Sequence, residues 1–233
     1  MPPLGPPIFL HIPKTAGTSL REALVGVYGE DRCLFIYEHE FEQDPDDLAA
    51  MQGAASQAAM VYGHMSYGVH RALGLEARYL AVVREPVGRV VSFFRHQARD
   101  PASEHFEAIA DGMTMTDLLR SGSSYQMANH MTRILSGQDD HEVMRDRAPL
   151  ERAMANIANE FVSVGLADEM DETISRMGQE LGWAAPAVPS LNVDPNPPRA
   201  ALDAATRAEI LHHNALDAEL YDRVRSVFKS ASR

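Results

Sequence analysis

The fold is decided by residues 8–19, whose sequence is IFLHIPKTAGTS. Ile8–Ile12 is a short, mostly apolar run after a proline cluster, which is typical of a buried parallel strand. A proline ends this run, and the loop Pro13–Thr18 follows it. Ser19 and Glu22 fit a capping box, the pattern that opens a helix. The stretch therefore predicts a strand, a tight loop and a helix within about twenty residues.

The same order of elements recurs along the chain. Further strands are predicted at Met60–Tyr62, Tyr79–Val83 and Phe161–Leu166. Pro86 stands at the first position of a predicted helix that continues to His96. Strands that alternate with helices indicate an α/β fold of three layers, with a central, mostly parallel sheet flanked by helices. Ligands of such sheets bind at the carboxyl ends of the strands.

The remaining helices are predicted from apolar spacing and from stop signals. They are expected at Pro45–Met51, over a largely helical region from 103 to 160 in which one helix stops at Gly137, at Glu169–Leu181 before Gly182, and as one long amphipathic helix over Asp203–Ser230. The segment from 31 to 57 is otherwise expected to be irregular, and the five prolines between 184 and 199 predict an extended loop. A single domain over residues 1–233 accommodates all of these elements.

Composition excludes several classes of protein. The chain of 233 residues has 45% hydrophobic and 23% charged residues, which is typical of a globular protein. Its net charge of −12 argues against nucleic-acid binding, so an anionic ligand must meet a local positive pocket. Cys33 is the only cysteine, and no stretch approaches the length of a transmembrane segment. We therefore expect a soluble, cytoplasmic protein.

The loop after the first strand has the form of a phosphate cradle. A small loop that contains a glycine and enters a helix N-terminus offers backbone N–H groups to an anion. Lys14 precedes the only glycine of this loop, whereas the nucleoside-triphosphatase loop has its lysine after a second glycine. The position of this lysine argues against ordinary use of ATP or GTP. The alternative is a helix cap with a solvated lysine.

Two further segments carry candidate side chains just after predicted strands. Arg84 and Ser92 can reach one phosphate if the chain doubles back, although Arg84 can equally pair with a neighbouring acid while Ser92 faces outward. His64 follows a strand and a glycine, a position suited to a general base, although a single histidine is more often structural. No metal site is predicted, because neither the histidines nor the single cysteine has the spacing of known ligand sets.

Together, Ile8–Ser19 and Val83–Phe93 resemble the two motifs that bind 3′-phosphoadenosine 5′-phosphosulfate (PAPS) in the sulfotransferase superfamily. The residue sequence of these motifs is most similar to that of the carbohydrate branch, which contains heparan sulfate 2-O-sulfotransferase and bacterial relatives. Tyr62–His64 is similar to the Gly-His segment that holds the catalytic base of that branch. Weaker similarity extends over Asn129–Gly137, Val164–Leu166 and Leu181–Trp183.

The resemblance implies a P-loop-like fold and a set of binding residues. The loop that would hold the 5′-phosphosulfate consists of Lys14, Thr15, Ala16, Gly17, Thr18 and Ser19. Arg84 and Ser92 would bind the 3′-phosphate, which distinguishes PAPS from ATP. Arg199 occupies the place of a basic segment that closes over the nucleotide in the family.

The resemblance also implies a reaction. A sulfuryl group would pass from PAPS to a hydroxyl of a carbohydrate-like or small-molecule acceptor and leave 3′-phosphoadenosine 5′-phosphate (PAP). Lys14 would stabilise the negative charge that develops on the bridging oxygen, and His64 would take the proton of the acceptor hydroxyl. This scheme requires no metal.

Two other functions stay open at this stage. A nucleotide-dependent phosphotransferase of the kinase type shares the strand-loop-helix opening, but it needs Mg²⁺ and a suitable acidic residue. A non-catalytic nucleotide- or glycan-binding relative is the second alternative, and the combination of Lys14, His64, Arg84 and Ser92 argues against it. The acidic balance of the chain favours a small or weakly charged acceptor over a highly charged polymer.

Overall fold

The computed structural model describes residues 5–37, 45–138, 144, 146–182 and 202–230. Its centre is a parallel sheet of five strands in the order β2-β3-β1-β4-β5. The strands are β1 (Ile8–Leu10), β2 (Cys33–Ile36), β3 (Met60–Gly63), β4 (Tyr79–Val83) and β5 (Phe161–Leu166). The predicted α/β class with a central parallel sheet is confirmed.

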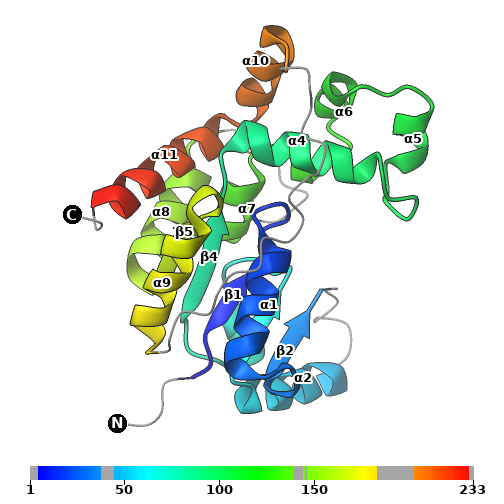
Figure 1. Ribbon diagram of the computed structural model, residues 1–233. Helices are drawn as coiled ribbons and strands as arrows, with labels where there is room; N and C mark the ends of the chain where they lie inside the picture. The colour runs from blue at the N-terminus through cyan, green and yellow to red at the C-terminus, as the bar shows by residue number, and fades with distance from the viewer. Residues whose placement is uncertain (1–4, 38–44, 139–143, 145, 183–201, 231–233) are drawn as a thin grey trace.

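Helices cover both faces of this sheet (Figure 1). The longer helices are α1 (Gly17–Tyr28), α2 (Pro45–Gln57), α4 (Pro86–Gln97), α8 (Ala148–Glu160), α9 (Met170–Leu181), α10 (Ala204–His213) and α11 (Ala215–Ser230). The short ones are α3 (Val69–Leu73), α5 (Phe106–Ala110), α6 (Met115–Ser121) and α7 (His130–Ser136), with 3-10 turns η1 (Glu30–Arg32), η2 (Tyr125–Met127) and η3 (Ala167–Glu169). None of the helices among the described residues is long and apolar enough to cross a bilayer.

Alternation along the strands builds two apolar cores. In β1, the side chains of Ile8 and Leu10 join the core under α7, α8 and α11, whereas Phe9 joins the core under α1 and α9. All three residues are buried, since a parallel sheet is covered on both faces. A third apolar cluster links α4 to α6 and α10 beyond the carboxyl edge of the sheet. The three-layer arrangement follows from these contacts.

The main differences from the sequence prediction are a strand that it lacks and a helix that it left undivided. The segment from 31 to 57 was expected to be irregular apart from a helix, but it contains β2 at one edge of the sheet. Most side chains of this edge strand are only half buried, so its apolar signal is weak. The predicted helix over Asp203–Ser230 is wrong as one element, because it divides at Asn214 into α10 and α11.

A polar network explains the break at Asn214. Its side-chain amide donates to the carbonyl oxygens of Met127 and Ile210. In return, the backbone N–H of Asn129 donates to Oδ1 of Asn214, and Oδ1 of Asn129 accepts from the backbone N–H of Leu216. The network fastens the start of α7 to the junction of α10 and α11. The predicted stops at Gly137 and Gly182 are confirmed as left-handed caps.

Candidate functional site

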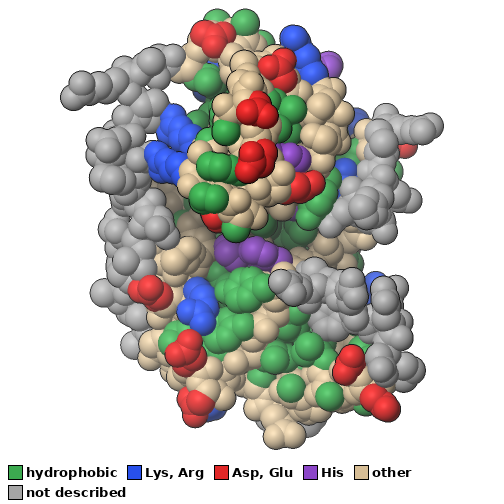
Figure 2. All heavy atoms as spheres, turned by 90° about the vertical axis from the view of Figure 1, so that its right-hand side faces the viewer, with side chains coloured by type: hydrophobic (Ala, Val, Ile, Leu, Met, Phe, Trp, Pro, Cys, Tyr) green, Lys and Arg blue, Asp and Glu red, His purple; other side chains and the backbone are tan. Residues whose placement is uncertain are grey.

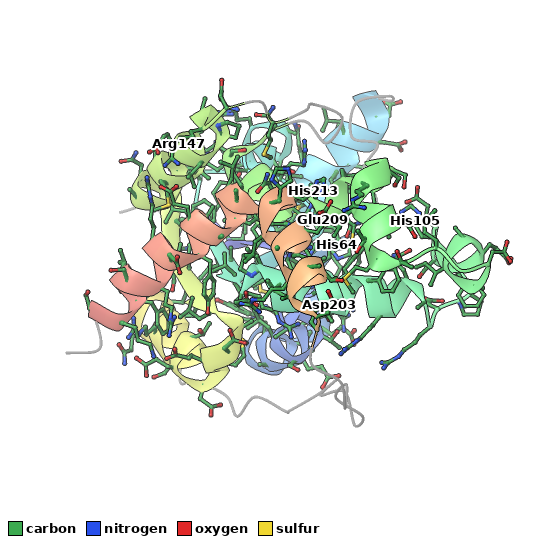
Figure 3. The ribbon with its side chains drawn as sticks, turned by 90° about the horizontal axis from the view of Figure 1, so that it is seen from above. His64, His105, Arg147, Asp203, Glu209 and His213 are labelled. Carbon is green, nitrogen blue, oxygen red and sulfur yellow. The ribbon has the colours of Figure 1, made fainter. Side chains whose placement is uncertain are left out.

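The carboxyl edge of the sheet gathers the candidate side chains. Tyr37, His64, His11 and Arg84 follow β2, β3, β1 and β4, and they keep that order along the edge. Adjacent strands lie about 4.8 Å apart. The rings of Tyr37 and His64 and those of His64 and His11 are in contact along this row. Figure 2 shows histidine side chains on the floor of a hollow between two parts of the surface, and Figure 3 shows His64 near the centre of the molecule.

The loop between β1 and α1 has an unusual backbone. Lys14 and Ala16 both lie in the left-handed region, with φ of 70° and 66°. The hydroxyl of Thr15 is buried and donates to the carbonyl oxygen of Ile12 at 2.8 Å, which holds the turn. Where left-handed and right-handed residues alternate along a chain, their backbone N–H groups point toward one centre. Anion-binding turns called nests have this geometry.

The start of α1 corrects the predicted capping box at Ser19. The helix begins at Gly17, its N-cap is Ala16, and no side chain forms a capping hydrogen bond. The N–H groups of a first helical turn have no partner within the helix, and they favour negative charge. The first turn also contains no acidic residue. This helix end is therefore suited to an anionic ligand.

Gly17 is required by the close packing of the loop on the sheet. A Cβ atom at Gly17 would lie 1.7 Å from Nε2 of His11, so a larger residue would clash with the imidazole ring. The hydroxyl of Tyr62 donates to the carbonyl oxygen of Gly17 at 2.8 Å. These contacts fix the loop against β1 and β3, directly beside the position of His64.

Positive charges surround the loop. The Arg84 guanidinium donates from Nη1 to the carbonyl oxygen of Lys14 at 3.0 Å. Burial lowers the pKa of Lys14, and the charges of Arg84 and Arg99 lower it further. Burial and the charge of Lys14 likewise lower the pKa of His96. In a chain with a net charge of −12, this local cluster is suited to a phosphate or sulfate group.

Helix α4 adds side chains beside the loop. Ser92 and His96 are four residues apart on α4 and therefore share one face of it. Glu85 caps this helix by accepting from the backbone N–H of Gly88 at 2.7 Å, so the acid nearest to Arg84 in sequence has a role of its own. The structure thus brings Arg84 into contact with Lys14. Ser92 lies on the same face of α4 as His96, which is close enough to Lys14 to feel its charge. His96 and Arg99 were missed, although their spacing from Ser92 was a usable signal.

His64 lies between two aromatic neighbours. Its backbone N–H donates to the carbonyl oxygen of Ile36 at 2.9 Å. Its ring centroid is 4.7 Å from that of His11 and 5.2 Å from that of Tyr37. Burial, followed by the charges of His64 and Lys14, lowers the pKa of His11 to about 3, so His11 is neutral near pH 7. Sequence reasoning missed both His11 and Tyr37.

A buried polar corner supports the start of α7. Both carboxylate oxygens of Asp217 accept backbone N–H groups of this helix, from Met131 at 3.0 Å and from Thr132 at 2.7 Å. Arg89 is fully buried and donates to the carbonyl oxygen of Gln126 at 2.7 Å. Burial lowers the pKa of Arg89 to about 10, and the charge of Asp217 partly offsets this effect. The corner orients α7, which begins with the buried His130.

One predicted site residue and one hollow lie apart from this arrangement. Arg199 lies outside the described residues. A hollow of about 540 Å³ adjoins the C-terminal end of α7, and none of the predicted site residues lines it; its lining residues are Tyr67, Arg71, Ser136, Gly137, Gln138, Arg152 and Asn156.

Comparison with known proteins identifies the family. The model of the Sulfotransferase family matches residues 7–185, which include the loop, His64 and the segment from Arg84 to Ser92. A crystal structure of mouse sulfotransferase SULT7A1 complexed with PAP matches at 12% identity with a TM-score of 0.43. The alignment covers 89% of this chain and 62% of that protein, so the chain spans less than two thirds of its length. No curated protein matches. Because the family model covers more than half of the sequence, the chain belongs to the sulfotransferase family.

Proposed function

We propose that the protein transfers a sulfuryl group from PAPS to a hydroxyl of a carbohydrate-like or small-molecule acceptor. The observation that carries this proposal is the contact between Arg84 and the carbonyl oxygen of Lys14, in a loop beside His64. A positively charged cradle and a candidate base thus meet at one edge of the sheet. Both are needed for transfer of an anionic group to a hydroxyl.

The donor would be held at both of its charged ends. The N–H groups of the loop from Lys14 to Ser19 and of the first turn of α1 are suited to the 5′-phosphosulfate. Arg84 and Ser92 would bind the 3′-phosphate, with the guanidinium group providing a charged hydrogen bond. Arg99 lies close enough to Lys14 to add positive charge to the same site. Arg199 remains a candidate for closing it.

The proposed transfer requires one bond to form and one to break. The acceptor oxygen forms a bond to sulfur, while the bond between sulfur and the bridging phosphate oxygen breaks. Lys14 stabilises the charge that accumulates on the departing oxygen. The acceptor proton passes to His64, which must be neutral to take it. Neutral His11 adds no charge beside that base.

Support for a carbohydrate acceptor comes from the resemblance to the heparan sulfate 2-O-sulfotransferase branch. That assignment rests on the amino-acid sequence of residues 8–19 and of Tyr62–His64. The net charge of −12 favours an acceptor of low negative charge. We therefore propose an acceptor that is weakly charged or neutral.

The test of this function is transfer of radiolabelled sulfate from PAPS to a panel of hydroxyl compounds in the presence of a chelator. The proposal predicts labelled product without added metal, together with release of PAP. Phosphate transfer from ATP that depends on Mg²⁺, with no sulfate transfer, would establish the kinase alternative instead.

A further inference from the structure

An exposed aromatic ring lies next to the proposed base. Tyr37 is 42% exposed, whereas large hydrophobic side chains in the described part of the chain are mostly buried. Its ring centroid is 5.2 Å from that of His64, with the two planes at 85°. An exposed aromatic ring beside the proposed base offers a flat apolar face on which a ligand can stack.

Neighbouring side chains hold the ring of Tyr37 in place. It is parallel to the ring of Phe35, with centroids 6.4 Å apart and planes at 2°. Arg21 covers Phe35 at 4.1 Å and donates a hydrogen bond to the side chain of Tyr37. Because these neighbours restrict the ring, little conformational freedom is lost when a ligand stacks on it.

The order of strands separates Tyr37 from the positively charged loop. Tyr37 follows β2, His64 follows β3 and His11 follows β1, in adjacent positions along the sheet. Lys14 and Arg84 lie on the β1 and β4 side of His64, where the donor is proposed to bind. The acceptor hydroxyl must come within about 3 Å of the base. The ring that carries this hydroxyl is then within reach of Tyr37.

We propose that Tyr37 is the acceptor platform, on which the apolar C–H face of a pyranose ring stacks while one of its hydroxyls reaches His64. This inference rests on the proposed sulfotransferase function. An open, one-sided surface is suited to a sugar, because the remaining hydroxyl groups stay in water. A purely aromatic acceptor such as a phenol would require an enclosed apolar pocket. Figure 2 shows hydrophobic side chains just below the histidines of the hollow, as this arrangement requires.

The test measures sugar binding separately from nucleotide binding and from turnover. Saturation-transfer NMR is recorded with methyl glucoside, methyl galactoside and methyl mannoside on the PAP-loaded protein, with 4-nitrophenol as the aromatic probe. The variants are Tyr37→Ala, Tyr37→Phe and, as a control on α11, Val227→Ala, which alters another exposed hydrophobic residue.

The proposal predicts that at least one pyranoside receives saturation in the wild type and that Tyr37→Ala weakens its binding about tenfold or more. Tyr37→Phe and Val227→Ala keep that binding, and all variants bind PAP within about twofold of the wild type, which also shows that they fold. Pyranoside binding that is absent in the wild type or unchanged in Tyr37→Ala overturns the proposal. The proposal is also overturned if Tyr37→Ala weakens the binding of 4-nitrophenol but not that of any pyranoside. Loss of PAP binding in the wild type would instead contradict the proposed function.

Discussion

At the scale of single residues, the loop after β1 combines backbone strain with positive charge. Lys14 and Ala16 adopt left-handed conformations, which cost about 1–3 kcal/mol each for residues other than glycine. Lys14 is also one of two lysines in a chain that otherwise uses arginine. Strain of this kind persists where the surrounding structure holds it and where the conformation serves binding. The proposed role of this loop accounts for both features.

Arg84→Ala is predicted to weaken PAP binding by about 1.5–3 kcal/mol, which corresponds to roughly 10- to 150-fold in Kd. The reason is the loss of a charged hydrogen bond and of a cation that contacts the loop. Calorimetric titration measures this change. Arg120→Ala, which removes an exposed arginine paired with Glu209, is the matched control and should bind PAP normally. Equal affinity in Arg84→Ala and the wild type would remove Arg84 from the nucleotide site.

His64→Ala is predicted to lower turnover by about 10² to 10⁴ while PAP affinity is retained. The side chain would act on the acceptor proton, and it is not among the groups proposed to hold the phosphates. Steady-state rates and a PAP titration on the same preparation separate the two effects. A variant with near-normal turnover would show that another residue is the base.

The sequence singled out some of the residues that lie together at this edge of the sheet and not others. Lys14 and Arg84 stood out because each belongs to a local motif at the end of a strand, and their roles stay predictions. His11 and Tyr37 did not, because their relation to His64 depends on the order of three strands in the sheet. The capping box at Ser19 was wrong because the loop geometry starts the helix at Gly17.

At the scale of elements, α7 is fixed by contacts far away in sequence. Its first turn donates backbone N–H groups to Asp217 on α11. At the same junction the backbone N–H of Asn129 donates to Oδ1 of Asn214, and Oδ1 of Asn129 accepts from the backbone N–H of Leu216. A helix of this length has little stability of its own, so these contacts define its position. No periodicity reveals such a network, which explains why the break between α10 and α11 was not predicted.

Asp217→Ala is predicted to destabilise the protein by about 3–5 kcal/mol. The change leaves the start of α7 without its acceptor and removes the negative charge near the buried Arg89. Urea unfolding measures the free energy. Asp222→Ala, an exposed position on the same helix, should change stability by less than about 0.5 kcal/mol. A similar small loss in both variants would contradict the structural role of Asp217.

At the scale of the whole molecule, an acidic chain surrounds a site that is locally positive. The parallel sheet produces this arrangement by bringing the ends of β1 and β4 together. The alternation of strands and helices predicted a parallel sheet, and three of its five strands match the prediction within one residue. The edge strand β2 was missed because half-buried side chains carry a weak pattern. That one domain spans residues 1–233 stays a prediction.

Two buried histidines make folding sensitive to acid. Burial lowers the pKa of His11 to about 3, and it lowers that of His130 well below its usual value. The unfolded chain binds these protons near pH 6.5, so it holds more protons than the folded chain at lower pH. Stability is therefore predicted to fall as the pH drops below about 6.5, by about 1.4 kcal/mol per pH unit for each histidine. The raised pKa of the buried Asp217 acts in the opposite direction.

The contribution of one histidine can be isolated with His130→Gln. Urea unfolding at about pH 7.5 and about pH 5.5 should show a loss of stability roughly 1.4 kcal/mol smaller in this variant than in the wild type. His212→Gln, at an exposed position on α10, should keep the loss of the wild type. An identical loss in His130→Gln and the wild type would show that His130 takes up its proton in the folded state.

The central claim is that the loop and Arg84 form a site for the donor nucleotide. The most direct measurement is calorimetric titration of the protein with PAP, ATP and adenosine 5′-phosphate without added metal. The account predicts that PAP binds and that neither of the other nucleotides binds comparably, because only PAP carries the 3′-phosphate proposed to contact Arg84 and Ser92. No binding of PAP, or a preference for ATP with Mg²⁺, would contradict it.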